Sequence, residues 1–254
     1  MGGRRQPRYA RWSGIERELR KAGVLLIAGV DEVGRGSLAG PVVASAVIMP
    51  PGVRAIRGVD DSKRLTRKER ERLCIRIRER AIAFAVGAAS VREIDAINIY
   101  NASVMAMRRA LARLAVHPDH VLVDGRRLRS LGVEHTAVID GDAKCFNVAC
   151  ASILAKVTRD RLMARLAARY PGFAWASNCG YGTADHVKCL VERGPTLHHR
   201  RLFVAAVEAR LRAGASLEEA GDIAVPAATE AIFASNHVVV EAVDCTPPYL
   251  VDVK

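Results

Sequence analysis

The chain has 254 residues, of which half are apolar and about a quarter are charged. This composition is typical of a globular protein with enough chain for one large domain or two small ones. No stretch reaches the roughly 18 apolar residues of a membrane span, and no apolar segment follows the basic N-terminus as it would in a secretory signal. We therefore expect a cytoplasmic protein without membrane contact.

The charge is unevenly distributed. Lys and Arg number 39 against 27 Asp and Glu, which gives a net charge of +12. Residues 213–254 carry −6, so residues 1–212 carry +18. A basic body of this kind indicates a polyanionic partner, and nucleic acid is the first candidate, although a ribosome-bound or simply basic protein would show the same excess. The six cysteines form no C-x-x-C pair, which favours scattered reduced thiols over a zinc site or a disulfide framework.

Apolar runs, helical spacing and a T-x-x-E capping box at Thr66 predict the secondary structure. In chain order, the predicted elements are a helix near 13–22, strands at 25–30 and 42–49, a helix from 66 to about 81, a strand at 82–89, a helix at 101–115, strands at 121–123 and 135–139, a long helix at 147–169, and helices at 183–193 and 201–212.

Three strands early in the chain, followed by strands mixed with helices, favour an α/β fold with a mixed five-stranded sheet flanked by helices. We divide the chain into a basic N-terminal extension (1–23), a catalytic domain (24–212) and an acidic C-terminal tail (213–254). The tail is Ala-rich and acidic, contains one weak strand at 238–240, and is expected to be partly disordered or docked on the body.

An acid pair, Asp31 and Glu32, follows the first predicted strand, and Gly34, Arg35 and Gly36 come directly after it. Adjacent acids are unfavourable if they are buried without a partner. Glycines on either side of Arg35 let the backbone approach a ligand closely, so that its N–H groups can meet phosphate or sugar oxygens. Taken alone, the segment could also be a tight turn with a solvated acid pair.

Two further acids lie at the ends of predicted elements. Asp124 ends a strand, and Asp142 precedes the long helix. Each is individually explained by an Asp-Gly turn or by a helix N-terminus. Together with Asp31 and Glu32, however, they can meet at one sheet edge, where four carboxylates require hard cations such as Mg²⁺ or Mn²⁺. In a basic protein, such a cluster is suited to cutting a phosphodiester.

The motifs in this order resemble those of bacterial ribonuclease HII over about residues 24–205. The resemblance rests on LLIAGVDEVGRGSLAGPVVASAVIM at 25–49, Asp61-Ser62-Lys63, EID with the following NI at 93–102, VDG at 123–125, GD at 141–142, ASILAKVTRDRLM at 151–163, GYGT at 180–183 and HHRR at 198–201. The first residues and the tail lie outside it.

The resemblance implies a ribonuclease H-like fold and a two-metal endonuclease with Mn²⁺ or Mg²⁺ as cofactor. The metal-binding and catalytic acids would be Asp31, Glu32, Asp124 and Asp142. Asp31 and Asp124 would help to hold one ion, and Asp31, Glu32 or Asp142 the other. The implied substrates are RNA/DNA hybrids and duplex DNA that contains single ribonucleotides, cut to leave 5′-phosphate and 3′-hydroxyl ends. We expect the enzyme to act as a monomer.

The resemblance also implies the substrate-binding residues. Gly34, Arg35 and Gly36 match the loop that senses the ribose 2′-OH, Tyr181 matches a tyrosine that packs on the ribonucleotide sugar, and Lys63 matches a position near the nucleic-acid backbone. The chain departs from the usual pattern at Ser37, where Pro is common, at Cys179, where Lys is common, at Leu202, where Ser is common, and in the AKCF that follows Asp142. These departures bear on substrate affinity more than on the reaction.

Three alternatives remain at this stage. Asp160 is a rival for the fourth acid, but it lies about five helical turns along the long helix, so we interpret it as a partner of nearby arginines. A ribonuclease HIII-like enzyme would usually carry an extra N-terminal DNA-binding domain. A catalytically silent nucleic-acid-binding protein on the same fold would not require four intact acids.

Overall fold

The computed structural model describes residues 14–52, 55–59 and 62–223. Within these ranges the strands are β1 (Ile27–Val33), β2 (Val42–Ile48), β3 (Ala83–Ala89), β4 (His120–Asp124) and β5 (His135–Val138). The helices are α1 (Gly14–Lys21), α2 (Arg67–Arg80), α3 (Val91–Ala112), α4 (Gly141–Lys144), α5 (Phe146–Arg169), α6 (Trp175–Asn178), α7 (Ala184–Arg193), α8 (Arg201–Arg212) and α9 (Leu217–Gly221), with a short 3₁₀ helix η2 at Ser62–Arg64.

The five strands form one mixed sheet, as predicted, and their order in the sheet is β3-β2-β1-β4-β5. β1 pairs antiparallel with β2 and parallel with β4, and β4 pairs parallel with β5. Because β1 and β4 run in the same direction, their carboxyl ends lie at the same edge of the sheet. That edge carries Asp31 and Asp124.

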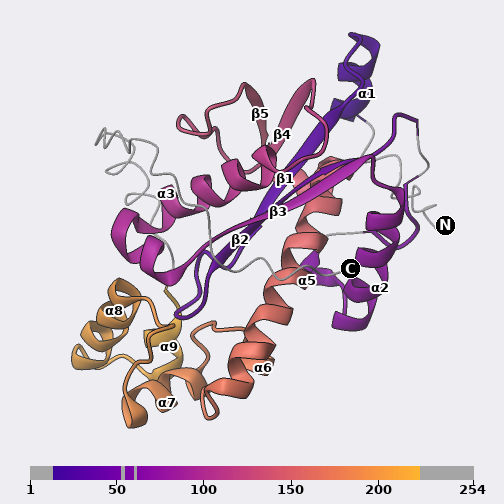
Figure 1. Cartoon of the computed structure of the whole chain (residues 1–254). Helices are drawn as coiled ribbons and strands as arrows, with labels where there is room; N and C mark the ends of the chain where they lie inside the picture. The colour runs from indigo at the N-terminus through magenta and orange to yellow at the C-terminus, as the bar shows by residue number, and fades with distance from the viewer. Residues whose placement is uncertain (1–13, 53–54, 60–61, 224–254) are drawn as a thin grey trace, which may run out of the picture.

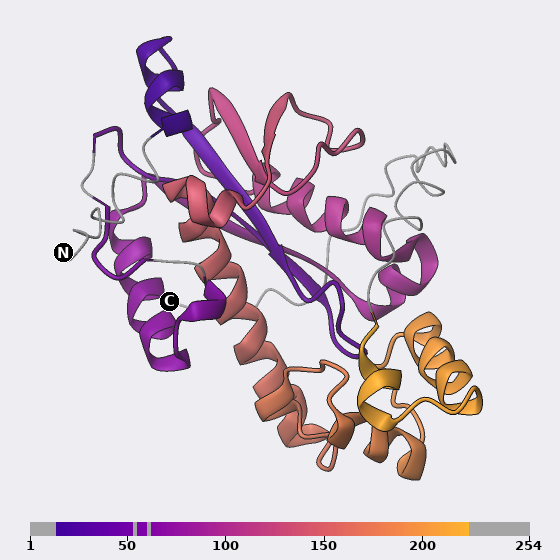
Figure 2. The same ribbon diagram turned by 180° about the vertical axis from the view of Figure 1, so that it is seen from behind.

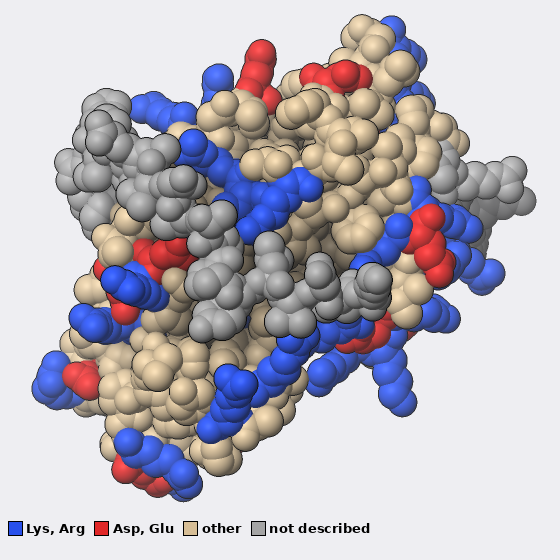
Figure 3. Space-filling model, viewed as in Figure 1, with Lys and Arg blue, Asp and Glu red and all other residues tan. Residues whose placement is uncertain are grey.

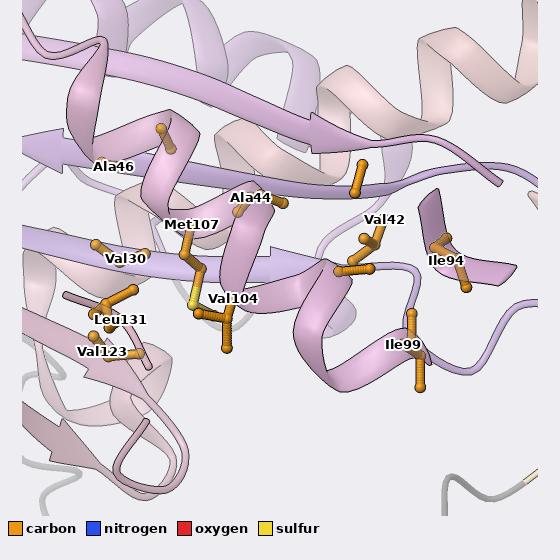
Figure 4. Close-up of a cluster of buried hydrophobic side chains, with 14 of the residues drawn as sticks. Val30, Val42, Ala44, Ala46, Ile94, Ile99, Val104, Met107, Val123 and Leu131 are labelled. Carbon is orange, nitrogen blue, oxygen red and sulfur yellow. The ribbon is translucent and has the colours of Figure 1, made fainter. Parts of the chain in front are cut away.

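Helices cover both faces of the sheet (Figures 1 and 2). α3 packs on one face, where Val104 and Met107 meet alternate residues of β1 and β2 (Figure 4). α5 and α2 pack on the other face with Val47 and Met49. Gly29 of β1 faces α5 so closely that an added Cβ would lie 2.1 Å from the backbone carbon of Asn147.

Buried polar contacts fix the start of α5. The Asn147 backbone N–H and its side-chain amide both donate to Glu16 Oε1, at 2.8 and 2.9 Å, and Asn147 Oδ1 accepts from the Met49 N–H at 2.7 Å. Glu16 on α1 is almost fully buried, and this burial raises the pKa of its carboxyl group. α1 therefore holds the N-terminus of α5 against the sheet.

α3 begins ten residues earlier than predicted. A capping box between Ser90 and Glu93 starts it, and Asn98 then interrupts it with φ 66° and ψ 168°. The Asn98 side chain accepts from the Asn101 N–H at 3.0 Å, so it caps the second part of the helix. The apolar spacing used for the prediction belongs to this second part.

The C-terminal helices α7, α8 and α9 gather at the end of the sheet near the β1–β2 connection (Figure 1). α9 lies within the segment assigned to the acidic tail. Its last residue, Gly221, meets Gly182 so closely that a Cβ on either glycine would lie about 2 Å from the other's carbonyl oxygen. The predicted strand at 238–240 lies outside the described residues, and no helix in the described ranges is long and apolar enough to cross a membrane.

The close approach of β1 and α5 yields a stability prediction. Gly29→Ala should lower the free energy of unfolding by about 1–3 kcal/mol, because the new methyl group meets backbone that cannot turn aside. Gly14→Ala is the control, since nothing lies within 4 Å of its added Cβ. Thermal unfolding of both variants measures the difference. Equal melting temperatures for Gly29→Ala and the unchanged protein would contradict the packing described here.

Candidate active site

Three of the four predicted acids meet at the sheet edge. Asp31 and Glu32 lie near the carboxyl end of β1, just before its last residue Val33, and Asp124 is the last residue of β4. Asp31 Oδ1 accepts from the Glu32 N–H at 2.7 Å, and Asp124 Oδ1 accepts from the Gly141 N–H at 2.6 Å. The parallel pairing of β1 and β4 thus brings together residues that are more than 90 positions apart.

The three carboxylates influence one another electrostatically. The pKa of Asp31, which is 7% exposed, is raised well above its usual value by burial first and then by the charges of Glu32 and Asp124. The pKa of Glu32 is also raised, by burial and by Asp124, although Arg35 opposes this shift with Nη1 3.2 Å from Glu32 Oε1. The site therefore concentrates negative charge that water does not solvate.

Two serines connect the acids to η2. The Ser152 hydroxyl on α5 hydrogen-bonds to Asp31 and stabilises its charged form, and Ser152 Oγ lies 2.9 Å from Ser62 Oγ. When Asp31 is ionised it can only accept, so Ser152 donates to Asp31 and accepts from Ser62. Lys63 follows Ser62 within η2, which brings its backbone to the margin of the acid cluster. Its role toward nucleic acid stays a prediction.

Asp142 lies in the first turn of α4, directly after the Gly141 whose N–H bonds to Asp124. Its backbone is therefore next to the other acids. No group of three or more His, Cys, Asp or Glu side chains within residues 14–52, 55–59 and 62–223 is arranged to hold a metal ion as it stands. The assignment of Asp142 as a ligand stays a prediction.

Asp160 belongs to a different interaction. It is 6% exposed and forms ion pairs with Lys156 Nζ at 2.7 Å and Arg70 Nη2 at 3.5 Å. Arg70 also donates to the carbonyls of Ser62 and Leu65, at 3.0 and 2.5 Å, and so ties η2 to α5. The interpretation of Asp160 as an ion-pair partner is confirmed, with a lysine in addition to the arginine.

The predicted substrate loop, residues 34–36, continues into a segment whose backbone is hydrogen-bonded to two other parts of the chain. Leu38 N–H donates to the Gly180 carbonyl at 2.8 Å, and Gly40 N–H donates to the His198 carbonyl at 2.8 Å. Gly34 has φ +93°, and its added Cβ would lie 2.1 Å from Arg159 Nε, so only glycine fits there. The loop and the 180–183 turn therefore form one connected surface.

Tyr181 has a fixed backbone and a partly exposed ring. Its N–H donates to the Asn178 carbonyl at 3.0 Å, and its side chain is 37% exposed. The Lys156 ammonium lies 5.8 Å and the Arg159 guanidinium 5.5 Å from the ring centroid. Lys156 lies one helical turn, about 6 Å, beyond Ser152 on α5. Since Ser152 bonds to Asp31 and Lys156 lies over the Tyr181 ring, α5 connects Tyr181 to the acid cluster.

A buried histidine pair supports the Tyr181 backbone. His186 Nδ1 lies 2.8 Å from the Tyr181 carbonyl and donates to it, while His186 Nε2 accepts from Trp175 Nε1 at 3.0 Å and lies 3.1 Å from His199 Nε2. The Thr196 N–H donates to His199 Nδ1 at 2.9 Å, so the protonated nitrogen of His199 is Nε2. Burial lowers the pKa of His186 and lowers that of His199 to about 4, so both rings are neutral at pH 7.

Three of the departures from the usual motifs, at Ser37, Cys179 and Leu202, lie around this surface, and the AKCF segment directly follows Asp142. Cys179 adopts a left-handed conformation with φ 51°, and its carbonyl accepts from Arg159 Nη1 at 2.8 Å. Leu202 is 65% exposed on α8, and the Ser37 hydroxyl is buried without a hydrogen-bond partner among the described residues. Sequence reasoning missed the supporting residues Ser152, Lys156, Arg159 and Arg200.

Among the charged side chains on the face shown in Figure 3, Lys and Arg prevail over Asp and Glu, including in the region over α2. α2 alone contributes a run of basic residues, Arg67, Lys68, Arg70, Arg72, Arg76, Arg78 and Arg80. This distribution fits the expected polyanionic partner.

The family model of Ribonuclease HII matches residues 28–206. The chain belongs to the ribonuclease HII family. A ribonuclease HII of Paraburkholderia xenovorans is 48% identical over 201 residues, which cover 79% of this chain and 81% of that protein. A ribonuclease HII of Thermosynechococcus vestitus is 51% identical over 182 residues, with 71% and 85% covered. The crystal structure of ribonuclease H2 from Pyrococcus horikoshii OT3 superposes with a TM-score of 0.63 at 28% identity and covers 74% of this chain and 99% of that one.

Membership in the ribonuclease HII family makes the protein a nuclease hydrolase that acts on RNA in RNA/DNA hybrids. The resemblance drawn from the motifs is therefore confirmed, and so is the ribonuclease H-like fold. The match supports ribonuclease HII over the HIII-like alternative.

The buried acids Asp31 and Asp160 should respond oppositely to neutralisation. In EDTA at pH 7, Asp31→Asn should raise the melting temperature by a few degrees, because it removes a buried charge next to two like charges. Asp160→Asn should lower the free energy of unfolding by about 3 kcal/mol, because it breaks a buried ion pair.

The gain from Asp31→Asn should depend on pH. The folded state holds the Asp31 proton more tightly than the unfolded chain, whose pKa is near 3.8. The destabilisation caused by ionising Asp31 therefore grows as the pH rises above 4 and disappears as the pH falls toward 4. Calorimetry of both variants between pH 4 and 8 measures this. A lowered melting temperature for Asp31→Asn across that range would contradict the electrostatic picture.

Proposed function

We propose that this ribonuclease HII hydrolyses the phosphodiester at a ribonucleotide, both in RNA/DNA hybrids and at single ribonucleotides embedded in duplex DNA, and leaves 5′-phosphate and 3′-hydroxyl ends. The observation that carries the proposal is the cluster of Asp31, Glu32 and Asp124, which share buried negative charge at one sheet edge. The enzyme would act as a monomer, through a catalytic domain that spans residues 24–212.

Asp31, Glu32, Asp124 and Asp142 would hold two divalent ions, Mn²⁺ or Mg²⁺. The donor set fits, because it consists of carboxylate oxygens whose mutual repulsion a hard cation relieves. When bound, such ions supply charge neutralisation, activation of a water molecule and stabilisation of the leaving oxygen. The raised pKa values of Asp31 and Glu32 show the electrostatic strain that a cation would remove.

The chain's own residues would orient the acids and the substrate. The Glu32 N–H and the Ser152 hydroxyl orient Asp31, and the Gly141 N–H orients Asp124. The 34–36 loop and Tyr181 would contact the ribose, and Lys63 the backbone. Recognition would then depend on duplex shape, phosphate charge and the 2′-OH, with little base-edge contact.

Removal of one carboxylate should separate catalysis from binding. Asp31→Asn should reduce cleavage of a duplex with one ribonucleotide by roughly a thousandfold or more in Mn²⁺, because it weakens charge stabilisation worth several kcal/mol. Binding should persist, because the basic body remains. Single-turnover cleavage and fluorescence anisotropy measure the two effects. Near-normal turnover of the variant would exclude Asp31 as a catalytic, metal-binding acid. If the unchanged protein itself were inactive in Mn²⁺, the alternative of a catalytically silent nucleic-acid-binding protein would be favoured.

The ring of Tyr181 should matter for single ribonucleotides in particular. Tyr181→Ala should lower cleavage of a duplex with one ribonucleotide by about tenfold to a hundredfold, as expected for one lost stacking contact, and that of a long hybrid less. Tyr181→Phe keeps the ring and is the matched control. Equal small losses on both substrates, together with a lower melting temperature, would indicate that the ring only packs within the loop.

A further inference from the structure

Two arginines with fully buried side chains lie beneath the predicted substrate loop. Arg200, at the start of α8, donates from Nη2 to the Gly34 carbonyl at 2.6 Å, from Nη1 to the Arg35 carbonyl at 2.7 Å, and from Nε and Nη2 to the Gly40 carbonyl. Arg159 on α5 donates to the carbonyls of Ala39, Pro41 and Cys179, at 3.1, 2.9 and 2.8 Å. Together they bind six carbonyls of the loop and its neighbouring turn.

This arrangement is electrostatically unfavourable by itself. Neither guanidinium forms an ion pair within the described ranges, although buried charges in proteins are normally paired. Burial, followed by the repulsion of Arg159, lowers the pKa of Arg200 to about 9. Carbonyl oxygens accept the hydrogen bonds of both guanidinium groups, so the arginines fix the direction of those carbonyls.

The direction of the carbonyls sets the direction of the loop's N–H groups. In a trans peptide the C=O and the following N–H point to opposite sides. Because the Gly34 and Arg35 carbonyls point inward at Arg200, the N–H groups of Arg35 and Gly36 point away from it. Among the described residues, the nearest atom to an added Cβ at Gly36 would be the Ile223 carbonyl oxygen, at the ordinary contact distance of 3.6 Å.

We propose that Arg200 is a positioning residue for ribonucleotide recognition: it holds the Arg35 carbonyl inward and so turns the Gly36 N–H outward, toward a sugar hydroxyl or phosphate oxygen. Arg159 positions the turn that carries Tyr181 in the same way, because it binds the Cys179 carbonyl and lies beneath the Tyr181 ring. The two arginines thereby set the spacing between the loop and Tyr181. The inference rests on the proposed function of this loop.

Arg200→Lys tests the proposal, because one ammonium cannot satisfy three carbonyls in the planar geometry of a guanidinium. Arg201→Lys is the matched control, since the Arg201 side chain is 90% exposed. The affinities for a duplex with one ribonucleotide and for the same duplex in all-DNA form are compared in EDTA by anisotropy. Arg200→Lys should lose about fivefold to tenfold in preference for the ribonucleotide, the equivalent of one hydrogen bond, with nearly unchanged all-DNA affinity. Arg201→Lys keeps the positive charge, so it should leave both affinities nearly unchanged.

A measurement on the unchanged protein keeps the test decisive if Arg200→Lys does not fold. With glycine-selective ¹⁵N labelling, the Gly36 amide signal should shift on addition of the ribonucleotide duplex and much less with all-DNA duplex. Gly36→Ala assigns that signal, since its methyl group meets only an ordinary contact.

The outcomes separate the two proposals. Equal Gly36 shifts, or a full ribonucleotide preference in Arg200→Lys, would overturn the role of Arg200 while cleavage by the unchanged enzyme still supports the proposed function. Parallel loss of both affinities with a lower melting temperature would show that Arg200 is merely structural. An unchanged enzyme that neither prefers nor cleaves the ribonucleotide duplex would overturn the proposed function itself.

Discussion

The parallel pairing of β1 with β4 is the constraint on which the site depends. It brings Asp31 and Asp124 to one sheet edge and forces like charges into a region that burial shields from water. Every neighbouring contact bears on this charge: the Ser152 hydroxyl and the Gly141 N–H donate to the carboxylates, and Arg35 pairs with Glu32. These contacts reduce the repulsion without removing it, because the pKa values of Asp31 and Glu32 remain raised.

α5 joins the chemistry to the recognition surface. Ser152, Lys156 and Arg159 follow one another at spacings of four and three residues, so they share one face of the helix. The first bonds to Asp31, the second lies over Tyr181, and the third lies beneath Gly34 and the Cys179 carbonyl. The position of α5 is in turn set by Glu16 and by the close approach at Gly29. A shift of this helix would therefore move the acids and the substrate loop relative to each other.

Much of this could be predicted from the sequence, and the exceptions have physical causes. The buried strands have short, β-branched apolar runs, and the acids near the end of β1 and at the end of β4 stand out because charge there is unusual. The start of α3 was missed because Asn98 interrupts the apolar spacing with a left-handed residue. α9 was assigned to the tail because its composition is acidic, whereas its packing depends on the contact between Gly182 and Gly221, which no local pattern reveals. Arg159 and Arg200 were missed because arginine usually indicates a surface. The polar residues of the 151–163 run, at helical spacing within a buried helix, were the available signal.

The structure leaves two sets of opposite charges buried and unpaired with each other. The acids lie at the sheet edge, and Arg159 and Arg200 lie beneath the substrate loop, where carbonyl oxygens accept their hydrogen bonds. Direct pairing of the two sets would stabilise the fold more simply, but it would consume the carboxylate oxygens and release the loop carbonyls. Because the two sets are separate, the carboxylates remain available for cations. The arginines in turn hold the backbone of the substrate loop in the direction that would face the sugar. The ionic arrangement of this chain is thus better explained by binding than by stability, because each set is unfavourable in the free protein.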